Sequence, residues 1–507
     1  MTTLNSKTLP AAIVLASLSL TAHAAFPPRP VPPPPPQPAP ELNTLDASLA
    51  NIIAAQGLTG VVAAAQTAPK ITEPLAQLGM KLFFSKALGG EKSVACASCH
   101  HPALGGADGL SLPVGVNAID ANVIGPGRRA VQNEVDIPRN SPTVFNAGLA
   151  ERALFWDGRV ERITRTAANG ETVTGVSTPD SGIGRIDPAV PNDLLDALAR
   201  FPVTSTEEMR GTGFTTATNN QQIRTHIAER IGDYGALQGD LDTNDWLAEF
   251  RAAYNSAEPA ETLITFDSIA MALGEYQHAM TFVDTNWHRY VRGDKQALSD
   301  AQKRGAISFF TPVNQGGAGC VACHSGERFT NEGFFNLAFP QMGIGKGENH
   351  EDLGRGHLTP QPRDQFAFKV PSLINVAVTA PYGHAGVYQN LDEVVRHYVN
   401  PPAAVDAFFA RGGACSLRQF NRSATCDSLN TNSMENSEQA LQLLGQSPFQ
   451  PARLNREQQQ DLVAFLQALT DNCVMQTACL RQFIPANTDS DPDNLRLNAV
   501  NRIGNPL

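Results

Sequence analysis

The sequence of 507 residues has little charge, no basic excess and no long apolar run. Charged residues make up 17%, and 38 Lys and Arg face 49 Asp and Glu, which gives a formal net charge of −11. A protein without a global basic field is a poor ligand for phosphate backbones, so nucleic acid is excluded as a main partner. No stretch beyond the first residues approaches the roughly 18 apolar residues of a transmembrane span, so we expect none in the mature chain. The 42% hydrophobic residues are enough for folded cores.

The first 24 residues resemble a secretory signal. Lys7 gives a positive start, Ala11 to Leu20 form an apolar run too short to cross a bilayer, and Ala22-His23-Ala24 is a small-x-small cleavage site. An uncleaved anchor is the alternative. We therefore predict a signal peptide at residues 1–24 and a periplasmic location, with cell-surface association left open. Residues 25–45 follow as a proline-rich linker, because a proline run lacks the amide donors of a packed element.

Two C-x-x-C-H motifs are the strongest chemical signal. They are Cys96-Ala97-Ser98-Cys99-His100 and Cys320-Val321-Ala322-Cys323-His324. Two thiols at this spacing can add to the vinyl groups of one haem, and the adjacent histidine then binds the iron. Zinc usually needs two C-x-x-C pairs some 15–20 residues apart, and a redox C-x-x-C needs a βαβ setting. We predict covalently bound haem c at both motifs.

The segments around the motifs repeat. An amphipathic helix is predicted before each motif, at Leu75 to Phe84 and at Ala301 to Phe310, and each is joined to its motif by a glycine-containing loop. Further helices are expected at Phe266 to Phe282 and after the capping box that starts at Asn455. Strand-like alternation is scarce, so the predicted fold is mainly α with long loops and two c-type cytochrome domains. The predicted ranges are 46–262 for the N-terminal domain, 263–485 for the C-terminal domain and 486–507 for a tail.

Four other cysteines lie in the C-terminal quarter: Cys415, Cys426, Cys473 and Cys479. An exported protein can keep them oxidised, and three pairings are possible. Closeness in sequence favours Cys415–Cys426 and Cys473–Cys479. We predict a structural role for them and assign none to the insertion at residues 415–450.

Several sequence blocks, in order, resemble the bacterial di-haem cytochrome c peroxidases and their MauG-type relatives. The blocks are RNSPTVFNAG (Arg139 to Gly148), FWDGR (Phe155 to Arg159), RYVRGD (Arg289 to Asp294), DLGRGHLT (Asp352 to Thr359), FKVPSLINV (Phe368 to Val376), TAPYGHAG (Thr379 to Gly386) and LDEVVRHY (Leu391 to Tyr398). The similarity spans about residues 75 to 470. It implies that the C-terminal haem relays electrons and the N-terminal haem binds peroxide.

The resemblance also bears on the sixth iron ligands. Many such peroxidases carry a blocking histidine after the first motif, and Val116 stands at that place here, which implies an open N-terminal haem. The alternative is that His101 or a more distant histidine fills the site. The second haem usually takes a methionine where this chain has Tyr398, a residue that MauG-type proteins use as a ligand. An oxygen ligand favours ferric iron, whereas methionine raises the potential. His357 and His397 are spare candidates for the second iron.

Two further roles follow from the resemblance. Trp156 of FWDGR matches the tryptophan that carries electrons between the haems, and Glu208 matches the glutamate that moves protons at the peroxide site, with Glu207 as the alternative. Taken alone, the tryptophan would be a packing residue and the glutamate a solvated acid. The segment between them is longer than expected, and the next glutamine after the tryptophan is only Gln221.

A bridging calcium ion is implied as well. Asn140 matches the family's side-chain ligand, and Thr379 and Pro381 match its backbone carbonyl ligands. His384 and Arg355 are expected near the haems without binding iron.

The leading hypothesis is an exported di-haem peroxidase that reduces hydrogen peroxide with electrons from a small cytochrome c or a cupredoxin. The alternative is a MauG-type enzyme that uses peroxide to oxidise aromatic residues of a partner protein. A non-catalytic di-haem electron carrier is the third hypothesis, and it would require a sixth protein ligand on the first haem.

Overall fold

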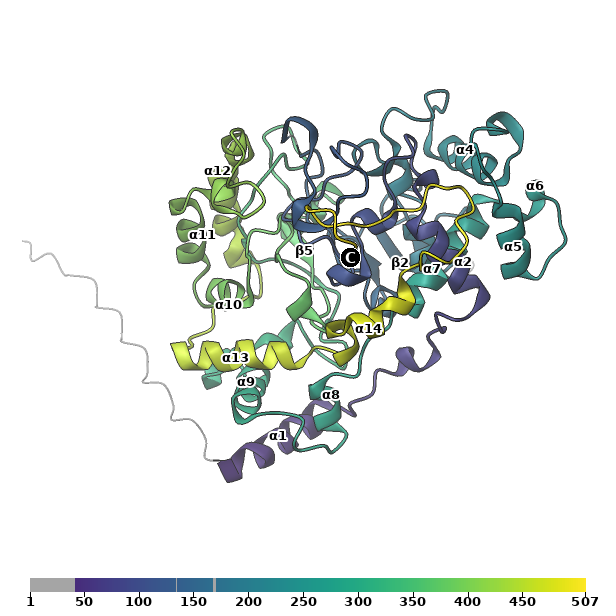
Figure 1. Cartoon of the computed structure of the whole chain (residues 1–507). Helices are drawn as coiled ribbons and strands as arrows, with labels where there is room; N and C mark the ends of the chain where they lie inside the picture. The colour runs from purple at the N-terminus through teal and green to yellow at the C-terminus, as the bar shows by residue number, and fades with distance from the viewer. Residues whose placement is uncertain (1–41, 134, 167–169) are drawn as a thin grey trace, which may run out of the picture. The chain divides into compact units, whose positions relative to one another are not determined.

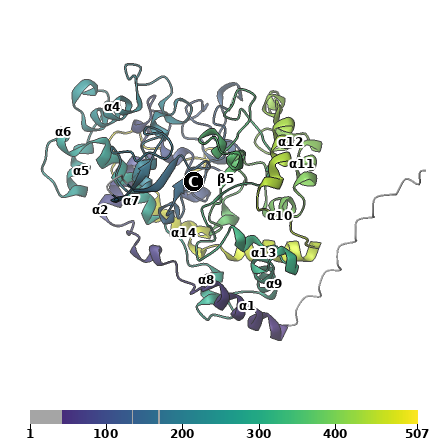
Figure 2. The ribbon, with the colours of Figure 1, turned by 180° about the vertical axis from the view of Figure 1, so that it is seen from behind.

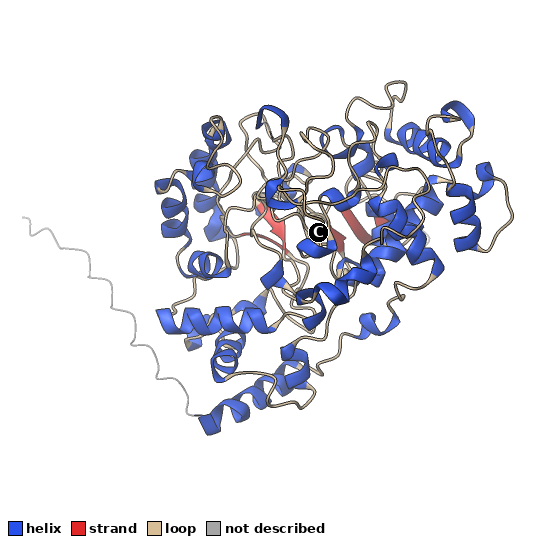
Figure 3. Cartoon of the chain, viewed as in Figure 1, coloured by secondary structure: helices blue, strands red, loops and turns tan. Residues whose placement is uncertain are grey.

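The computed structural model describes residues 42–133, 135–166 and 170–507, so the predicted signal peptide and most of the proline-rich linker lie outside the described residues. Helices predominate over strands in the described residues (Figure 3), which confirms the predicted mainly α class. No helix in this part of the chain combines the length and apolarity needed to cross a membrane. The α-helices are α1 (Leu42–Gln56), α2 (Pro74–Phe84), α3 (Leu194–Leu198), α4 (Asn220–Gly232), α5 (Trp246–Tyr254), α6 (Ala260–Leu263), α7 (Phe266–Ala279), α8 (Asn286–Val291), α9 (Asp300–Phe310), α10 (Leu391–Val399), α11 (Pro401–Ala410), α12 (Ser433–Leu443), α13 (Arg456–Ala468) and α14 (Thr477–Leu480).

Two small antiparallel sheets accompany the helices. Strands β1 (Ala153–Leu154), β2 (Val160–Thr166) and β3 (Thr172–Ser177) form one, and β4 (Phe334–Asn336) and β5 (Ala367–Lys369) form the other. In the first sheet Glu161 is opposite Ser177 and Thr166 is opposite Thr172. The sequence pattern did not predict the β2–β3 hairpin, because the outer half of this hairpin is exposed and lacks a clear buried face.

The internal repeat is a pair of crossed helices, present twice. Helix α2 packs on α7, and α9 packs on α13, as can be followed in Figures 1 and 2. A Cβ added at Gly79 of α2 would lie 1.9 Å from the carbonyl oxygen of Ala272, and one at Gly305 of α9 would lie 1.9 Å from that of Asp461. Both glycines therefore permit the same close helix crossing, and the predicted duplication is confirmed at this level.

Each helix pair belongs to its own hydrophobic cluster. The first contains Phe83, Leu273 and Tyr276, and the second contains Phe309 and Phe465. The clusters differ from the predicted domain ranges. Helix α7 closes the first cluster although it follows the predicted boundary at residue 263, and α1, which begins inside the predicted linker, packs on α9 in the second. A closing helix ends each repeat. This helix is α7 in the first pair and α13 in the second.

The insertion after α10 forms a third apolar cluster with α11 and the turns before α12. These helices lie on the flank opposite α4 to α6 (Figure 1). The disulfides Cys415–Cys426 and Cys473–Cys479 are both present, which confirms the favoured pairings. Asp427 lies near the first bridge, but both sulfurs there are consumed by the disulfide and leave no thiolate for a metal.

Candidate functional site

One cavity of about 1370 Å³ receives side chains from both C-x-x-C-H motifs. This volume exceeds the roughly 300–1,000 Å³ of ordinary small-molecule pockets. Its walls include Phe83 and Val94 of the first hydrophobic cluster and Leu462 and Leu466 of the second. The cavity therefore lies between the two repeated helix pairs.

The first motif forms a tight turn that aims its histidine. Residues Cys96–Ser98 form a 3₁₀ turn, and the His100 amide donates to the Cys96 carbonyl at 3.0 Å. Ser141 donates to the Cys99 carbonyl at 2.8 Å and lies 3.3 Å from His100 Nδ1. Burial lowers the pKa of His100 to about 4, so the imidazole is neutral. A neutral ring anchored at Nδ1 leaves Nε2 for a metal.

The second motif repeats this arrangement. Residues Cys320–Ala322 form a 3₁₀ turn, and the His324 amide donates to the Cys320 carbonyl at 2.9 Å. His324 Nδ1 donates to the Phe329 carbonyl at 3.0 Å, and burial lowers the pKa of this histidine to about 4. The anchored nitrogen is again Nδ1.

The donor set fits haem at both motifs. All four motif cysteines are free thiols, and burial raises the pKa of Cys96 and of Cys320 to about 12, which keeps these two protonated. Thiol pairs and neutral imidazoles around a large, mainly apolar cavity are the groups that a covalently attached haem requires. The number of haems and their thioether bonds stay predictions.

Glu208 lies at the first motif's end of the cavity. It sits in the π-helical turn Thr206–Arg210, where its amide donates to Ser205 Oγ at 3.2 Å. Burial is the main cause of the raised pKa of the Cys99 thiol, and the negative charges of Asp108 and then of Glu208 add to it. The Glu207 side chain is exposed and accepts a hydrogen bond from Ser205 at 3.1 Å. Both glutamates line the cavity, so the choice of Glu208 over Glu207 stays a prediction.

Two cations line the cavity and act on Glu208. Burial raises the pKa of Glu208, and the positive charges of Arg159 and Lys346 oppose that rise. The same cations face Asp157, with Arg159 Nη1 3.1 Å from Oδ1 and Lys346 Nζ 3.7 Å from Oδ2. Arg139 also pairs with Asp157, at 2.5 Å. Burial lowers the pKa of Lys346 to about 8.

The sequence analysis gave no role to these charged residues. Arg139, Asp157 and Arg159 belong to two of the quoted blocks, so the blocks contained the signal. Lys346 lies in the glycine-rich stretch GIGKG, which has no pattern that indicates a site.

The long segment between Trp156 and Glu208 has a structural explanation. It forms the β2–β3 hairpin and then α3, whose N-cap Asp193 accepts hydrogen bonds from the amides of Leu195 and Asp196. The chain then returns to the cavity at the turn that carries Glu208. Gln221 lies in α4, outside the cavity lining.

Trp156 lines the cavity and is bonded to segments from both halves. Its Nε1 donates to the Asn140 carbonyl at 2.8 Å, and the next residue, Ser141, bonds to Cys99 of the first motif. Its carbonyl accepts from the Lys369 amide at 2.8 Å, at the end of β5, whose partner strand β4 follows the second motif. This position suits an electron relay, which stays a prediction.

Neither of the two residues considered as a block of the first haem site brings a histidine into the cavity. Val116 packs against the first cluster, and its amide donates to the Glu207 carbonyl at 3.3 Å. His101 is fully buried against Phe84 and does not line the cavity. Among the described residues, the histidines that line the cavity are His100, His324 and His384.

Tyr398 lies beside the second motif. It projects from α10 into the cavity lining, and burial, followed by the charges of Cys320 and Cys323, raises the pKa of its phenol. The rings of Phe339 and Phe449 pack edge-on against it, with centroids 6.1 and 5.7 Å away. Tyr398 is therefore placed at the second motif, but a bond to iron stays a prediction.

The spare histidine candidates do not line the cavity. His397 uses both ring nitrogens, Nδ1 with the Tyr388 hydroxyl at 2.7 Å and Nε2 with the Leu337 carbonyl at 2.8 Å. His357 Nε2 accepts from the Leu353 amide at 2.9 Å. Neither ring is available to the cavity in this arrangement.

Asn140, Thr379 and Pro381, the predicted calcium ligands, all line the cavity. Asn140 is buried, and its Nδ2 donates to the Leu110 carbonyl at 2.8 Å, so its Oδ1 is the atom left for a cation. Oxygen donors suit calcium. The ion itself stays a prediction.

The two residues expected near the haems differ in position. His384 lines the cavity, where its ring stacks on Phe368 at a centroid distance of 3.9 Å. Arg355 does not line the cavity and instead pairs with Glu161 at 2.6 Å.

Comparisons with known proteins agree with this site. The family model described as di-haem cytochrome c peroxidase matches residues 73–296. The methylamine utilization protein MauG of Methylorubrum extorquens is 29% identical over 331 residues, covering 65% of this chain and 69% of the relative. The cytochrome c551 peroxidase of Pseudomonas aeruginosa is 27% identical over 325 residues, covering 64% and 71%.

A solved structure shares the fold. A MauG-like protein associated with microbial copper homeostasis superposes with a TM-score of 0.50 at 21% identity, covering 84% of this chain and 94% of that one. One of the two named relatives is a peroxidase by name, and the family model is described as a di-haem peroxidase. This chain is similar to the di-haem cytochrome c peroxidases and the MauG proteins, and the family model matches its residues 73–296.

Proposed function

We propose that this chain is an exported di-haem peroxidase. It reduces hydrogen peroxide to two waters with two protons and two electrons, and the electrons pass from the C-terminal to the N-terminal haem. Bound haem c would supply the redox-active iron at each motif, one for electron storage and one for peroxide. The donor is a small cytochrome c or a cupredoxin, and the location is the periplasm or the cell surface.

The observation that carries this proposal is that Glu208 lines the same cavity as His100, on a turn that packs against Gly115, whose neighbour Val114 has its carbonyl 4.0 Å from Cys99 Sγ. A carboxylate beside the reacting oxygen can take a proton from peroxide and return it to the leaving oxygen. Burial raises the pKa of Glu208, which makes it a stronger base once ionised, while Arg159 and Lys346 keep the ionised form accessible.

Trp156 supplies the connection between the two ends. Its indole is fixed by the hydrogen bond to Asn140, and its backbone by the one from Lys369. A fixed ring needs little reorganisation when an electron passes, and its position between both halves is what a relay requires.

A second candidate function is supported by Tyr398. A phenol beside Cys320 and Cys323 is the arrangement expected of a MauG-type enzyme, which withdraws electrons from aromatic residues of a partner protein. In that case the electrons for peroxide reduction come from the partner.

One experiment separates these functions. Peroxide is added to the haem-loaded protein, first fully oxidised and then with one electron per molecule. A fast spectral change in the oxidised protein, followed by oxidation of a co-encoded protein, supports the MauG-type function. Turnover with reduced cytochrome c or cupredoxin supports the peroxidase, and no reaction in either state would leave an electron carrier.

Tyr398→Phe tests the ligand prediction directly. Loss of a phenolate from iron should change the absorption and electron paramagnetic resonance spectra of the second haem. Tyr382→Phe is a matched control, because Tyr382 also lines the cavity but bonds to the Val376 carbonyl at 2.9 Å. An unchanged Tyr398→Phe spectrum would remove the ligand assignment.

A further inference from the structure

The loop at residues 108–116 runs from the first motif to the turn that carries Glu208. The Val114 carbonyl lies 4.0 Å from Cys99 Sγ. A Cβ added at Gly115 would lie 2.0 Å from the Glu207 carbonyl oxygen, and the Val116 amide donates to that same oxygen. The backbone of this loop is thus one wall against which the Glu208 turn rests.

The middle of this loop is held by the insertion. Gln419 accepts a hydrogen bond from the Leu112 amide at 3.1 Å and donates one to the Leu112 carbonyl at 2.7 Å. The Leu112 side chain is fully buried in the third cluster, which also contains Leu417 and Phe420. The Gln419 side chain therefore satisfies both the amide and the carbonyl of Leu112. The Leu112 side chain is enclosed by the same segment.

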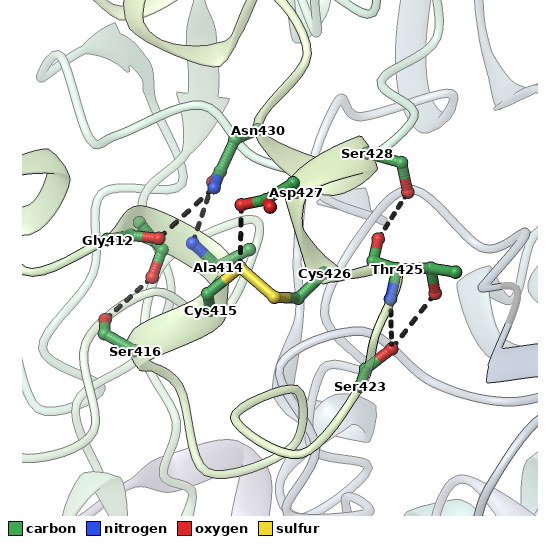
Figure 4. The surroundings of a disulfide bond; sticks show 11 residues. Gly412, Ala414, Cys415, Ser416, Ser423, Thr425, Cys426, Asp427, Ser428 and Asn430 are labelled. Atoms are coloured by element: carbon green, nitrogen blue, oxygen red, sulfur yellow. Dashed lines mark hydrogen bonds between the residues drawn. A yellow bond between two sulfur atoms is a disulfide. The ribbon is translucent and has the colours of Figure 1, made fainter.

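The segment that carries Gln419 is itself closed by a disulfide. Cys415 and Cys426 flank it, and Asn430 Oδ1 accepts from the Ala414 amide at 2.8 Å, which ties the base of the loop (Figure 4). A cross-link across a short loop limits the conformations that Gln419 can adopt.

Arg128 holds the far part of the same loop. Its guanidinium donates to the Val114 carbonyl at 2.7 Å and to the Gly115 carbonyl at 3.1 Å. The Gln419 contact is therefore the one tether of this loop that comes from the insertion through hydrogen bonds among the described residues.

We propose that Gln419 is a positioning residue for Glu208: the disulfide-closed segment at residues 413–430 holds the loop at 108–116 against the Glu208 turn. This gives the insertion a role at the first motif, although it follows the second in sequence. The inference deepens the proposed function. The predicted effect on kinetics depends on that function, whereas the predicted tether between Gln419 and the loop does not.

Hydrogen exchange of the haem-loaded protein tests the tether. Gln419→Ala removes both hydrogen bonds, so the amides of residues 110–116 should exchange roughly tenfold faster. Gln419→Glu keeps the acceptor for the Leu112 amide and should give an intermediate rate. Gln482→Ala is the matched control, because Gln482 also donates to a backbone carbonyl, that of Cys479, away from the loop. Unchanged exchange in Gln419→Ala would overturn the proposal.

The two disulfides offer a second comparison. Replacing Cys415 and Cys426 by Ser should speed exchange at residues 110–116, whereas replacing Cys473 and Cys479 by Ser should leave this loop unchanged. Equal effects of the two pairs would show a general loss of stability and would contradict a specific tether.

Kinetics test the positioning role. Gln419→Ala should shift the pH profile of the peroxide reaction and lower its rate several-fold, because the surroundings of Glu208 relax. Faster exchange with an unchanged pH profile would overturn the positioning role. If Glu208→Gln itself leaves the peroxide reaction unchanged, the proposed function fails and the positioning role with it, while the exchange result still decides the tether.

Discussion

The two ends of the cavity share the helices, turn and histidine of the C-x-x-C-H motif. They differ in the side chains that surround the motif. Each end has the glycine-crossed helix pair, the 3₁₀ turn and a histidine anchored at Nδ1. Ionisable side chains face the first motif, namely Glu208, Arg159 and Lys346. At the second, the rings of Phe339 and Phe449 pack around Tyr398, and the cavity also receives Arg328 and Glu332, which follow the motif in sequence.

This difference shows where the two ends diverged. The repeated helices determine where a cofactor binds, and the connecting segments determine what it does. Glu208 arrives on the segment after the β2–β3 hairpin, whereas Tyr398 arrives on α10 just before the insertion. In the proposed function, proton chemistry belongs to the first end and electron storage to the second.

The largest expected effect is at Glu208. Glu208→Gln removes the proton acceptor at the first end and should slow the peroxide reaction by roughly a hundredfold to ten-thousandfold. Stopped-flow absorbance of the haem-loaded protein measures this. Glu207→Gln, on the exposed neighbour, should have little effect, and the opposite ranking would assign the role to Glu207.

The helix crossings should respond alike at both ends. Gly79→Ala and Gly305→Ala each force a Cβ against a backbone carbonyl that cannot swing aside. We expect each to lower the free energy of unfolding by about 1–3 kcal/mol, which overpacking typically costs, despite the better helix propensity of alanine. Gly445→Ala is the control, because nothing lies within 4 Å of its added Cβ. Thermal unfolding of the three variants checks this, and a loss at one end alone would contradict the equivalence of the pairs.

The features that the two ends share could be predicted from the sequence. The features in which they differ could be predicted only in part. The spacing of Cys96 and Cys99 and the glycine-containing helices are local patterns, so they gave both motifs and the repeat. Glu208 and Tyr398 could be identified only through the family resemblance. Their place depends on contacts between segments far apart in the chain.

Other features had no readable signal. The α7 helix was predicted, but its partner was not, because packing on α2 depends on a close approach at Gly79 that local periodicity does not encode. Gln419 is a polar residue in an insertion, and only the folded chain brings it to Leu112. Lys346 is likewise a lone lysine in a glycine-rich loop.

The smallest expected effect is a shift in the pH dependence of the peroxide reaction when Lys346 is replaced. It tests the electrostatic difference between the two ends of the cavity. The positive charge of Lys346 opposes the burial that raises the pKa of Glu208. Lys346→Met removes that charge, so the pKa of Glu208 should rise further and the acid limb of the peroxide reaction should move to higher pH. On that limb the carboxylate is scarcer, so the rate should fall roughly threefold to tenfold.

Lys346→Arg keeps the charge and is the matched control, so its limb should stay near that of the unchanged protein. The same Lys346→Met variant should leave the spectrum of the second haem unaltered, because burial is the main influence on the Tyr398 phenol and Lys346 is not among the groups that act on it. An acid limb that does not move would mean that the charge of Lys346 stabilises only the Asp157 carboxylate, 3.7 Å away. In that case Arg159 alone would oppose the rise in the pKa of Glu208. A change at the second haem would instead mean that the two ends are coupled through the cavity, and the division between a proton end and an electron end would fail.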